Sequence, residues 1–423
     1  MSSARKTALN IISRIDSGGF SNLVLKQMLN DSDISERDRA FVSNLVYGVI
    51  ERKLTLDFGV EKLSGRSVKK IDSLALQCIR LGLYQLWYMD KVPESAAINE
   101  SVKLVKMSHK AFLSGFVNAV LRNAQRQKGP VLPKDDGSAN ALSVIYSCPE
   151  WIVQRLIDDY GYDNTVGILK HSLEKKDITV KVNTLKIDVN GLINQFSDLG
   201  VEVVKTQVKN VILLKNPGSI EKNELYKNGY FHVQDCASAI CAESIDSVSG
   251  CRVLDMCAAP GGKTFSIAEN MGDIGEIVAC DIHKHRTKLI SNGAERLGLK
   301  IIKPMVLDAT IFCDRLGKFD RVLCDVPCSG LGVIGKKPDI KYKDESEFAQ
   351  LPQIQYNIIC NASKYLLDGG RLVYSTCTLS KRENEEVVAR FIKNNPQFKV
   401  VSMKTYFPLT DGTDGFFICV LTR

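Results

Sequence analysis

The chain has 423 residues, of which 44% are hydrophobic and 25% are charged, and its net charge is +8. This length and composition are typical of a soluble globular protein of two or three domains. No apolar run reaches the about 18 residues that a membrane span needs, and charged residues interrupt the first apolar stretch, so neither a membrane helix nor a secretory signal is expected.

Thirteen cysteines are scattered along the chain without the spacing of a disulfide framework. An odd, irregular set of this kind favours a reduced, cytoplasmic protein, in which most cysteines are small buried hydrophobic residues. Cys324 and Cys328 come closest to the spacing of metal ligands, but no second pair or histidine cluster completes a site. We therefore predict that the protein binds no structural metal.

Residues 1–130 are predicted to form an all-α bundle, because apolar residues recur at three- and four-residue spacing between short breakers such as Gly18-Gly19 and Asp31-Ser32-Asp33. Tyr84 and Trp87 lie on such an apolar stripe and are expected in the core. This part holds 20 Lys and Arg against 12 Asp and Glu, so it carries the whole net charge. Its basic character indicates a module that docks on a polyanion.

Three motifs in this helical part resemble those of the NusB-type RNA-binding domain. They are Asp38-Arg39-Ala40-Phe41, Val92-Pro93-Glu94 and the segment from Phe116 to Arg122. The resemblance implies that residues 1–130 bind RNA.

A second domain is predicted over residues 140–235, after a linker rich in proline, glycine and aspartate. It combines two amphipathic helical segments, beginning near Trp151 and Asp163, with three short strands: ITVKVNTLK, VEVVKT and VILLK. His232 near its end is expected to be a packing residue. The pattern favours a small α+β domain that links the two larger ones and contributes to RNA binding.

Residues 236–423 alternate apolar strand-length runs with polar or helical segments, which predicts a doubly wound parallel sheet, an α/β Rossmann-like domain. Four successive strands end in an acid. These acids are Asp255, Asp281, Asp308 and Asp325. Since ligands of such sheets lie at the carboxyl ends of the strands, Asp281 is placed to accept the hydroxyls of a ribose, and Asp308 to hold an adenine amino group.

The segment between the first of these strands and its helix is a tight glycine turn. It runs through Cys257, Ala258, Ala259, Pro260, Gly261, Gly262 and Lys263. A phosphate-binding loop would need glycine where Cys257 stands, and the dinucleotide fingerprint is absent. Of the three ligand classes that use such a turn, this leaves the nucleoside-type site of an S-adenosylmethionine-dependent methyltransferase.

Two cysteines follow neighbouring predicted strands, Cys328 after Asp325 and Cys377 within Ser375-Thr376-Cys377-Thr378. Two thiols beside a methyl donor suit methylation of carbon 5 of cytosine, since a thiolate that adds to carbon 6 makes carbon 5 nucleophilic. Afterwards the carbon-5 proton must leave so that the thiolate is eliminated. Asp325 can bind the ring nitrogen, and Lys263 can lower the thiol pKa from its usual value of about 8.5.

These motifs resemble those of RNA cytosine-C5 methyltransferases, and with the NusB-like part in front the chain is similar to the RsmB (Sun, Fmu) branch. The resemblance implies that Cys377 is the nucleophile, that Cys328 serves product release, and that Cys257 to Lys263 with Asp281, Asp308 and Asp325 bind S-adenosylmethionine. It also implies a cytosine in 16S ribosomal RNA as substrate, free or partly assembled, and a monomeric enzyme. Cys148 and Cys236 stand where the family usually has histidine and an acid; both departures lie outside the catalytic motifs.

Other functions are compatible with parts of this pattern. A DNA cytosine methyltransferase would use Cys328 as the nucleophile and would normally lack the helical part. An RNA-binding assembly factor with a vestigial donor site, or a methyltransferase acting on transfer RNA, is also conceivable, and a methyl-transfer assay together with bisulfite mapping would separate them.

Overall fold

The computed structural model describes residues 4–16, 21–30, 35–174 and 177–423. The predicted breakers Gly18-Gly19 and Asp31-Ser32-Asp33 lie outside these residues. The chain divides into two compact units, of which one holds the residues up to Leu173 together with Ile334–Lys343, and the other holds Glu174–Val333 and Asp344–Arg423. No helix in the described part is long and apolar enough to span a membrane.

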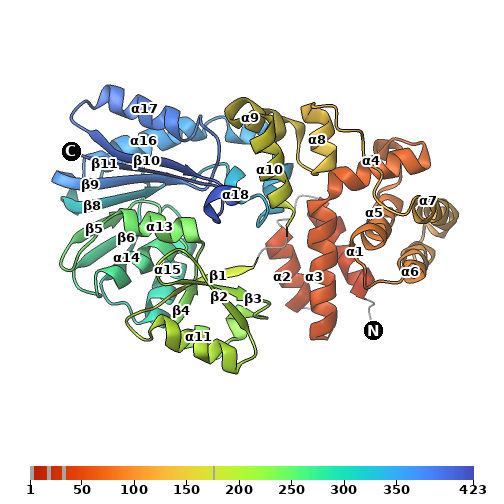
Figure 1. The fold of residues 1–423 in the computed structure, drawn as a ribbon, viewed down its shortest axis with the longest axis horizontal. Helices are drawn as coiled ribbons and strands as arrows, with labels where there is room; N and C mark the ends of the chain where they lie inside the picture. Colours follow the sequence, from red (N-terminus) through yellow and green to blue (C-terminus); the bar gives the residue numbers. More distant parts are fainter. Residues whose placement is uncertain (1–3, 17–20, 31–34, 175–176) are drawn as a thin grey trace. The chain divides into compact units, whose positions relative to one another are not determined.

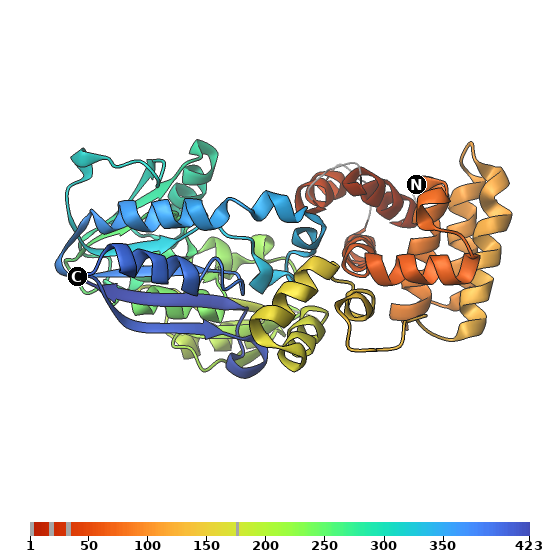
Figure 2. The ribbon, with the colours of Figure 1, turned by 90° about the horizontal axis from the view of Figure 1, so that it is seen from above.

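The first unit is helical, as its apolar periodicity predicts (Figures 1 and 2). Its helices are α1 (Ala4–Asp16), α2 (Ser21–Asn30), α3 (Glu36–Glu51), α4 (Lys53–Ser64), α5 (Ser73–Tyr88), α6 (Glu94–Lys106), α7 (Ser114–Gln127), α8 (Ala139–Ile145), α9 (Glu150–Tyr160) and α10 (Tyr162–Ser172). Polar caps fix several helix starts, since the side chains of Ser35, Asp72 and Ser138 accept hydrogen bonds from the first turns of α3, α5 and α8.

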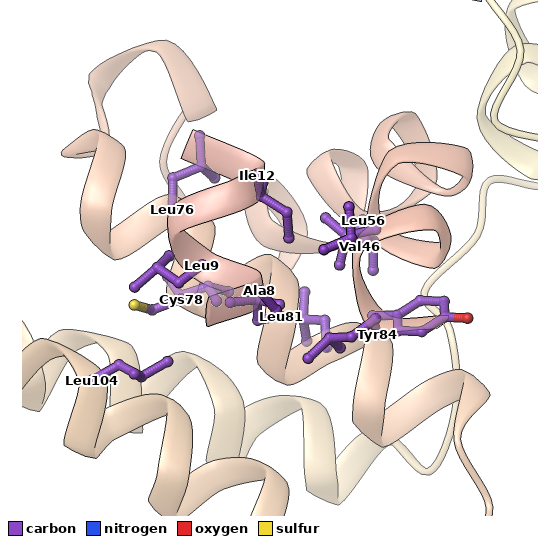
Figure 3. Packing of buried hydrophobic residues seen from close by; sticks show 14 of the residues in the cluster. Ala8, Leu9, Ile12, Val46, Leu56, Leu76, Cys78, Leu81, Tyr84 and Leu104 are labelled. Atoms are coloured by element: carbon purple, nitrogen blue, oxygen red, sulfur yellow. The ribbon is translucent and has the colours of Figure 1, made fainter. Parts of the chain in front are cut away.

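Helix α5 lies at the centre of this unit and has eleven buried residues. Figure 3 shows its Leu81 and Tyr84 close to Ala8 of α1 and Val46 of α3. Tyr84 is buried and Trp87 is partly buried against the same cluster, so both aromatic residues lie in the core as predicted. Burial of this apolar surface stabilises a bundle whose helices would be marginal alone.

A short segment from the C-terminal half of the sequence completes the helical unit. Residues 334–343 include a 3-10 helix, Pro338–Tyr342, in which Lys341 is fully buried and its ammonium donates to the carbonyl of Ser147 at 3.2 Å. The Tyr342 hydroxyl donates to the carbonyl of Ile50 at 2.5 Å. The sequence predicts these residues within the third domain, and nothing in their composition indicates this packing.

The second unit contains a small antiparallel sheet of order β2-β3-β1-β4, with helix α11 (Val189–Asp198) and the short α12 (Glu224–Lys227). Its strands are β1 (Ile178–Val182), β2 (Glu202–Lys205), β3 (Val211–Lys215) and β4 (Phe231–Val233). The first three are predicted from the sequence and β4 is not. Phe196 of α11 packs on Phe231 of β4 with ring centroids 5.4 Å apart.

The larger sheet of this unit has seven strands in the order β10-β11-β9-β8-β5-β6-β7. They are β5 (Arg252–Asp255), β6 (Glu276–Asp281), β7 (Ile302–Val306), β8 (Phe319–Asp325), β9 (Leu366–Thr376), β10 (Lys399–Tyr406) and β11 (Phe416–Thr422). The five predicted strands pair in parallel, which confirms the α/β architecture. The antiparallel pair β10 and β11 extends one edge and is not predicted.

Helices cover both faces of this sheet, as Figure 1 shows. One face packs against α13 (Cys236–Ser244), α14 (Gly262–Asn270) and α15 (Lys284–Leu297), and the other against α16 (Leu351–Ser363) and α17 (Glu385–Asn394). Neighbouring residues of one strand serve opposite faces: Val253 packs with the first group and Leu254 with the second. Strands β5, β6, β8 and β9 are buried on both faces, so they appear in the sequence as continuous apolar runs.

Candidate active site

The glycine turn lies between β5 and α14, at the carboxyl edge of the parallel sheet. The Ala258 amide donates to the carbonyl of Cys280 in β6 at 2.7 Å, and the Gly261 amide donates to the carbonyl of Ala258 at 2.8 Å. The Ala259–Pro260 peptide bond is cis. These contacts hold the turn against the neighbouring strand and direct the chain into α14.

Gly261 is required by the shape of this turn. Its φ of +114° lies in a region that residues with a Cβ rarely adopt, and a Cβ at this position would come within 2.3 Å of the Phe265 ring. Gly262 begins α14 in open surroundings, where a Cβ would meet nothing closer than the Gln234 amide at 3.7 Å. The turn therefore presents backbone rather than side chains at the start of the helix.

Asp255, at the end of β5, is fully enclosed behind this turn. One carboxylate oxygen accepts a hydrogen bond from the Thr264 hydroxyl at 2.7 Å. The other oxygen is buried and has no hydrogen-bond partner among the described residues. Burial raises the pKa of Asp255 to about 7, against the opposing effect of the Thr264 hydrogen bond.

Asp281 and Asp308 follow β6 and β7 at the same sheet edge. Asp281 is buried, accepts from the His283 amide at 3.0 Å and pairs with Arg286 at 3.0 Å. The Arg286 guanidinium also donates to the carbonyl of Ala259 at 2.7 Å, which connects this acid to the glycine turn. Asp308 is less enclosed and accepts from the amide and hydroxyl of Thr310 at 2.9 and 2.7 Å.

Lys263 and Asp325 form an ion pair at 2.7 Å between α14 and the end of β8. Asp325 also accepts from the Ser375 hydroxyl of β9 at 2.9 Å. Burial alone would lower the pKa of Lys263, but Asp325, with smaller contributions from Cys241 and Cys377, raises it above its usual value. The ammonium is thus charged, bonded to Asp325 and close enough to Cys377 to favour a negative charge on that sulfur.

Cys328 and Cys377 lie side by side at the ends of β8 and β9, their sulfurs 3.2 Å apart. Both residues are half-buried. The hydrogen bond with Cys377, followed by burial and the charges of Glu383 and Asp325, raises the pKa of Cys328 well above the usual thiol value. The Lys263 ammonium acts on this pair as well, since Cys377 is among the groups that raise the pKa of Lys263.

The loop after Cys328 and the loop before β11 both lie against the end of β9, where Cys377 is located. The Gly332 amide donates to the carbonyl of Cys377 at 3.1 Å, and the Gly415 amide donates to the carbonyl of Gly332 at 3.0 Å. A Cβ on Gly332 would lie 1.9 Å from the Gly415 carbonyl oxygen. Glycine at 332 thus permits the loop after Cys328 to cross the loop that precedes β11.

The structure brings all of the predicted site residues to one edge of the sheet, in two groups. The glycine turn with Asp281 and Asp308 forms one group, and Lys263, Asp325, Cys328 and Cys377 form the other. Nothing in the sequence pattern predicts a site role for Arg286 or for the buried polar residues behind the cysteines: Ser329, Gln355, Ser375 and Glu383. Glu383 lies in a turn six positions after Cys377. That position alone is a weak indication of a site residue, because the sequence does not show that Glu383 is buried.

His232 is buried, with its ring edge-on to Phe265 and within 3.4 Å of the Ser266 hydroxyl. It lies in the packing between β4 and α14, as expected for a packing residue. Over the described ranges, no group of three or more His, Cys, Asp or Glu side chains is arranged to hold a metal ion.

Three family models match successive parts of the chain. Residues 2–126 match the NusB family, residues 148–221 a ferredoxin-like domain of RsmF/B-like methyltransferases, and residues 243–422 the 16S rRNA methyltransferase RsmB/F. Each matched range lies inside one of the predicted domains, 1–130, 140–235 and 236–423, whose limits stay predictions.

Similar proteins extend over the whole chain. The probable ribosomal RNA small subunit methyltransferase B of Bacillus subtilis is 36% identical, with 100% of this chain and 99% of the relative aligned. Ribosomal RNA small subunit methyltransferase B of Escherichia coli is 28% identical over 92% of both chains.

Among solved structures, the protein PH0851 has a TM-score of 0.84 at 25% identity, covering 100% of this chain and 99% of that chain. NSun6 from Pyrococcus horikoshii, solved with SFG, has a TM-score of 0.61 at 23% identity, covers 65% of this chain and 98% of its own, and supports the fold alone. The identity to the Bacillus subtilis relative over the full length decides the assignment, and the chain belongs to the RsmB/F family of 16S rRNA methyltransferases.

Proposed function

We propose that this rRNA methyltransferase transfers a methyl group from S-adenosylmethionine to carbon 5 of a cytosine in 16S rRNA, through a covalent bond between Cys377 and carbon 6. The observation that carries the proposal is the pair of sulfurs 3.2 Å apart at the ends of two adjacent parallel strands, beside the Lys263–Asp325 ion pair. Methyl transfer to a nitrogen or oxygen would need no such pair of thiols.

The residues of the first group fit the methyl donor. The turn through Gly261 and Gly262 leaves room for a ligand to approach the backbone, and Asp255 behind it has a buried oxygen without a partner in the described part of the chain. Asp281 supplies an acid for the ribose hydroxyls, and Asp308 and the turn residues Cys257 to Lys263 complete the site. S-adenosylmethionine, when bound there, supplies an electrophilic methyl group.

In the first step the Cys377 thiolate forms a bond to carbon 6, and the electron pair of the C5–C6 double bond moves into the ring. Asp325, bonded to Lys263 and Ser375, is placed to pass a proton to the ring nitrogen as this charge develops there. That electron pair then forms the bond from carbon 5 to the methyl group, and the donor's sulfur would keep the electron pair of the broken sulfur–methyl bond. The thiolate is the reactive form, and the Lys263 ammonium favours it.

Release reverses the addition. A base takes the carbon-5 proton, the C–H electron pair restores the C5–C6 double bond, and the bond between carbon 6 and the Cys377 sulfur breaks. We assign Cys328 to this stage, because its sulfur is one hydrogen bond away from the sulfur that departs.

The test compares Cys377→Ala with Cys328→Ala on 16S rRNA in the presence of S-adenosylmethionine. Neither variant should turn over. Cys328→Ala should accumulate an adduct that survives denaturation and runs as a shifted, nuclease-sensitive band, whereas Cys377→Ala should form none. The opposite pattern would reverse the two roles and agree with the DNA-enzyme arrangement.

A substrate with 5-fluorocytosine provides the positive control, because fluorine at carbon 5 blocks elimination. If wild type forms no adduct even with this RNA, covalent catalysis is wrong. Bisulfite mapping of ribosomal and transfer RNA from a deletion strain identifies the methylated base, and comparing free rRNA with partly assembled particles identifies the substrate form. Sedimentation would test the expected monomer.

A further inference from the structure

A carboxylate that takes no part in the chemistry above lies buried directly behind the two cysteines. Glu383 is 2% exposed and sits in the turn between β9 and α17. Its side chain accepts three hydrogen bonds: from the Ser329 amide at 2.9 Å, from the Ser329 hydroxyl at 2.5 Å and from the Gln355 amide group at 2.9 Å. All three donors are neutral groups.

These bonds hold the loop that carries Cys328 on both of its sides. Ser329 follows Cys328, and Gln355, which bonds to Glu383, also donates to the carbonyl of Pro327 at 2.9 Å. Ser329 is thus bonded to Glu383 directly, and Pro327 is bonded to it through Gln355. Because both neighbours of Cys328 are held in this way, the Cys328 side chain has little freedom to move away from β9.

The loop that carries Cys377 is attached to the same turn. The Ser329 hydroxyl lies 2.8 Å from the Thr378 hydroxyl, so the carboxylate of Glu383 reaches this loop through Ser329. Asn384 accepts from the Thr376 hydroxyl at 2.5 Å and donates to the carbonyl of Thr378 at 3.0 Å. The residues on either side of Cys377 are thus bonded to the residue that follows Glu383.

A buried ionised carboxylate is unfavourable unless hydrogen bonds replace its hydration, and a solvent-exposed position would avoid that penalty. Here the carboxylate accepts directly from Ser329 and from Gln355 of α16, and it is connected to Thr378 through the Ser329 hydroxyl. A neutral side chain could not accept from the Ser329 amide, its hydroxyl and Gln355 at the same time. The charge on Glu383 is also among the influences that raise the pKa of Cys328, after the Cys377 hydrogen bond and burial.

We propose that Glu383 is a positioning residue for both thiols: its carboxylate joins the Cys328 and Cys377 loops and keeps the two sulfurs within one hydrogen bond of each other. The proposal rests on the proposed function for its catalytic meaning, because a two-thiol reaction needs this separation. The separation itself can be measured without RNA.

The first measurement is the rate at which diamide converts Cys328 and Cys377 into a disulfide, followed by mass spectrometry of the two linked peptides. Glu383→Ala should slow this rate by roughly tenfold or more, since small misplacements of reacting groups have large effects on rate. Glu383→Gln, which keeps the shape and most of the hydrogen bonds, should restore most of it. Glu386→Ala removes an exposed acid three residues further on and should leave the rate unchanged.

The second measurement is adduct formation with 16S rRNA in the Cys328→Ala background. Adding Glu383→Ala should lower the rate of adduct formation by roughly tenfold, with unchanged affinity for S-adenosylmethionine. All variants are compared at a temperature where each is folded. Circular dichroism establishes that condition. If Glu383 mattered only for folding stability, Glu383→Ala would not lower the adduct rate at that temperature, and Glu383→Gln would have no lost rate to restore.

The outcomes separate the two proposals. If Glu383→Ala forms the disulfide at the wild-type rate, positioning by Glu383 is refuted, whatever its effect on methylation. If the disulfide rate falls as expected but neither wild type nor Cys328→Ala ever binds RNA covalently, the positioning holds and the proposed reaction is wrong. Should Glu383→Ala not fold, Ser329→Ala removes the hydroxyl that links the loops and must itself slow the disulfide, or the proposal fails.

Discussion

Asp255 offers a measurable link between burial and pH. Its carboxylate is enclosed behind the glycine turn with one oxygen bonded to Thr264 and the other without a partner among the described residues. Burial raises its pKa from 3.8 to about 7. At about 1.36 kcal/mol per pH unit, the ionised form costs the folded state on the order of 4 kcal/mol at neutral pH.

The sign follows from proton binding. Between pH 4 and pH 7 folded Asp255 keeps a proton that the unfolded chain releases, so the stability present below pH 4 is lost as the pH rises to about 7. Asp255→Asn can still accept from Thr264 and carries no charge at any pH. We therefore expect the variant to be more stable than wild type at pH 8, with an advantage about 3 kcal/mol larger than at pH 5.

The assay is urea unfolding at pH 5 and pH 8, followed by far-ultraviolet circular dichroism. Tryptophan fluorescence is unsuitable, because Trp87 and Trp151 both lie in the helical unit rather than in the unit that contains Asp255. Asp308→Asn, at the same sheet edge but less enclosed, is the matched control and should give no gain. Equal stability of Asp255→Asn and wild type at pH 8, or the same gain at both pH values, would refute the reasoning.

Three further changes probe other parts of the molecule. Asp281→Ala should weaken S-adenosylmethionine binding by roughly 1–3 kcal/mol through loss of a charged acceptor, and calorimetry showing unchanged affinity would remove Asp281 from the donor site. Reversing the exposed charges of Lys103 and Lys106 to glutamate should lower RNA affinity and flatten its salt dependence, whereas an unaltered slope in binding titrations would place this surface outside the RNA contact. Gly332→Ala, whose Cβ would lie 1.9 Å from a carbonyl oxygen, should cost on the order of 1–3 kcal/mol in urea unfolding, while Gly115→Ala in open space should cost nothing.

The parts of the fold that the sequence reveals are those with a strong local pattern. Strands β5, β6, β8 and β9 are buried on both faces and appear as short apolar runs between polar segments. Strand β10 differs, because it lies at the edge of the sheet and residues 399–404 are all exposed, so its sequence KVVSMKTY mixes polar and apolar residues. Its partner β11 is apolar, but only the four-residue helix α18 (Pro408–Asp411) precedes it, so the strand–helix alternation that predicts the parallel strands does not predict this antiparallel pair.

Packing between segments that are distant in the sequence is harder to predict. Residues 334–343 belong by sequence to the stretch after Cys328, yet Tyr342 packs on the core of the helical unit and bonds to Ile50. A lysine and a tyrosine within a charged stretch would ordinarily be assigned to the surface. The full burial of Lys341 arises from a carbonyl acceptor, Ser147, which lies nearly two hundred residues earlier.

The same holds for the active site: only residues that a local sequence pattern marks can be predicted before the structure is known. Motif residues such as Cys377 and Asp325 are recognisable because each follows a predicted strand, and parallel strands bring their carboxyl ends together. Glu383 has no such marker: it lies in a turn beside Arg382 and Glu385, where an acid is ordinarily solvated. Glu383 can be buried because Ser329 and Gln355, on two other segments, donate hydrogen bonds to it. Its proposed role depends on those two partners. A catalytic motif therefore predicts which atoms react, while the side chains that hold them in place become visible only in the folded arrangement.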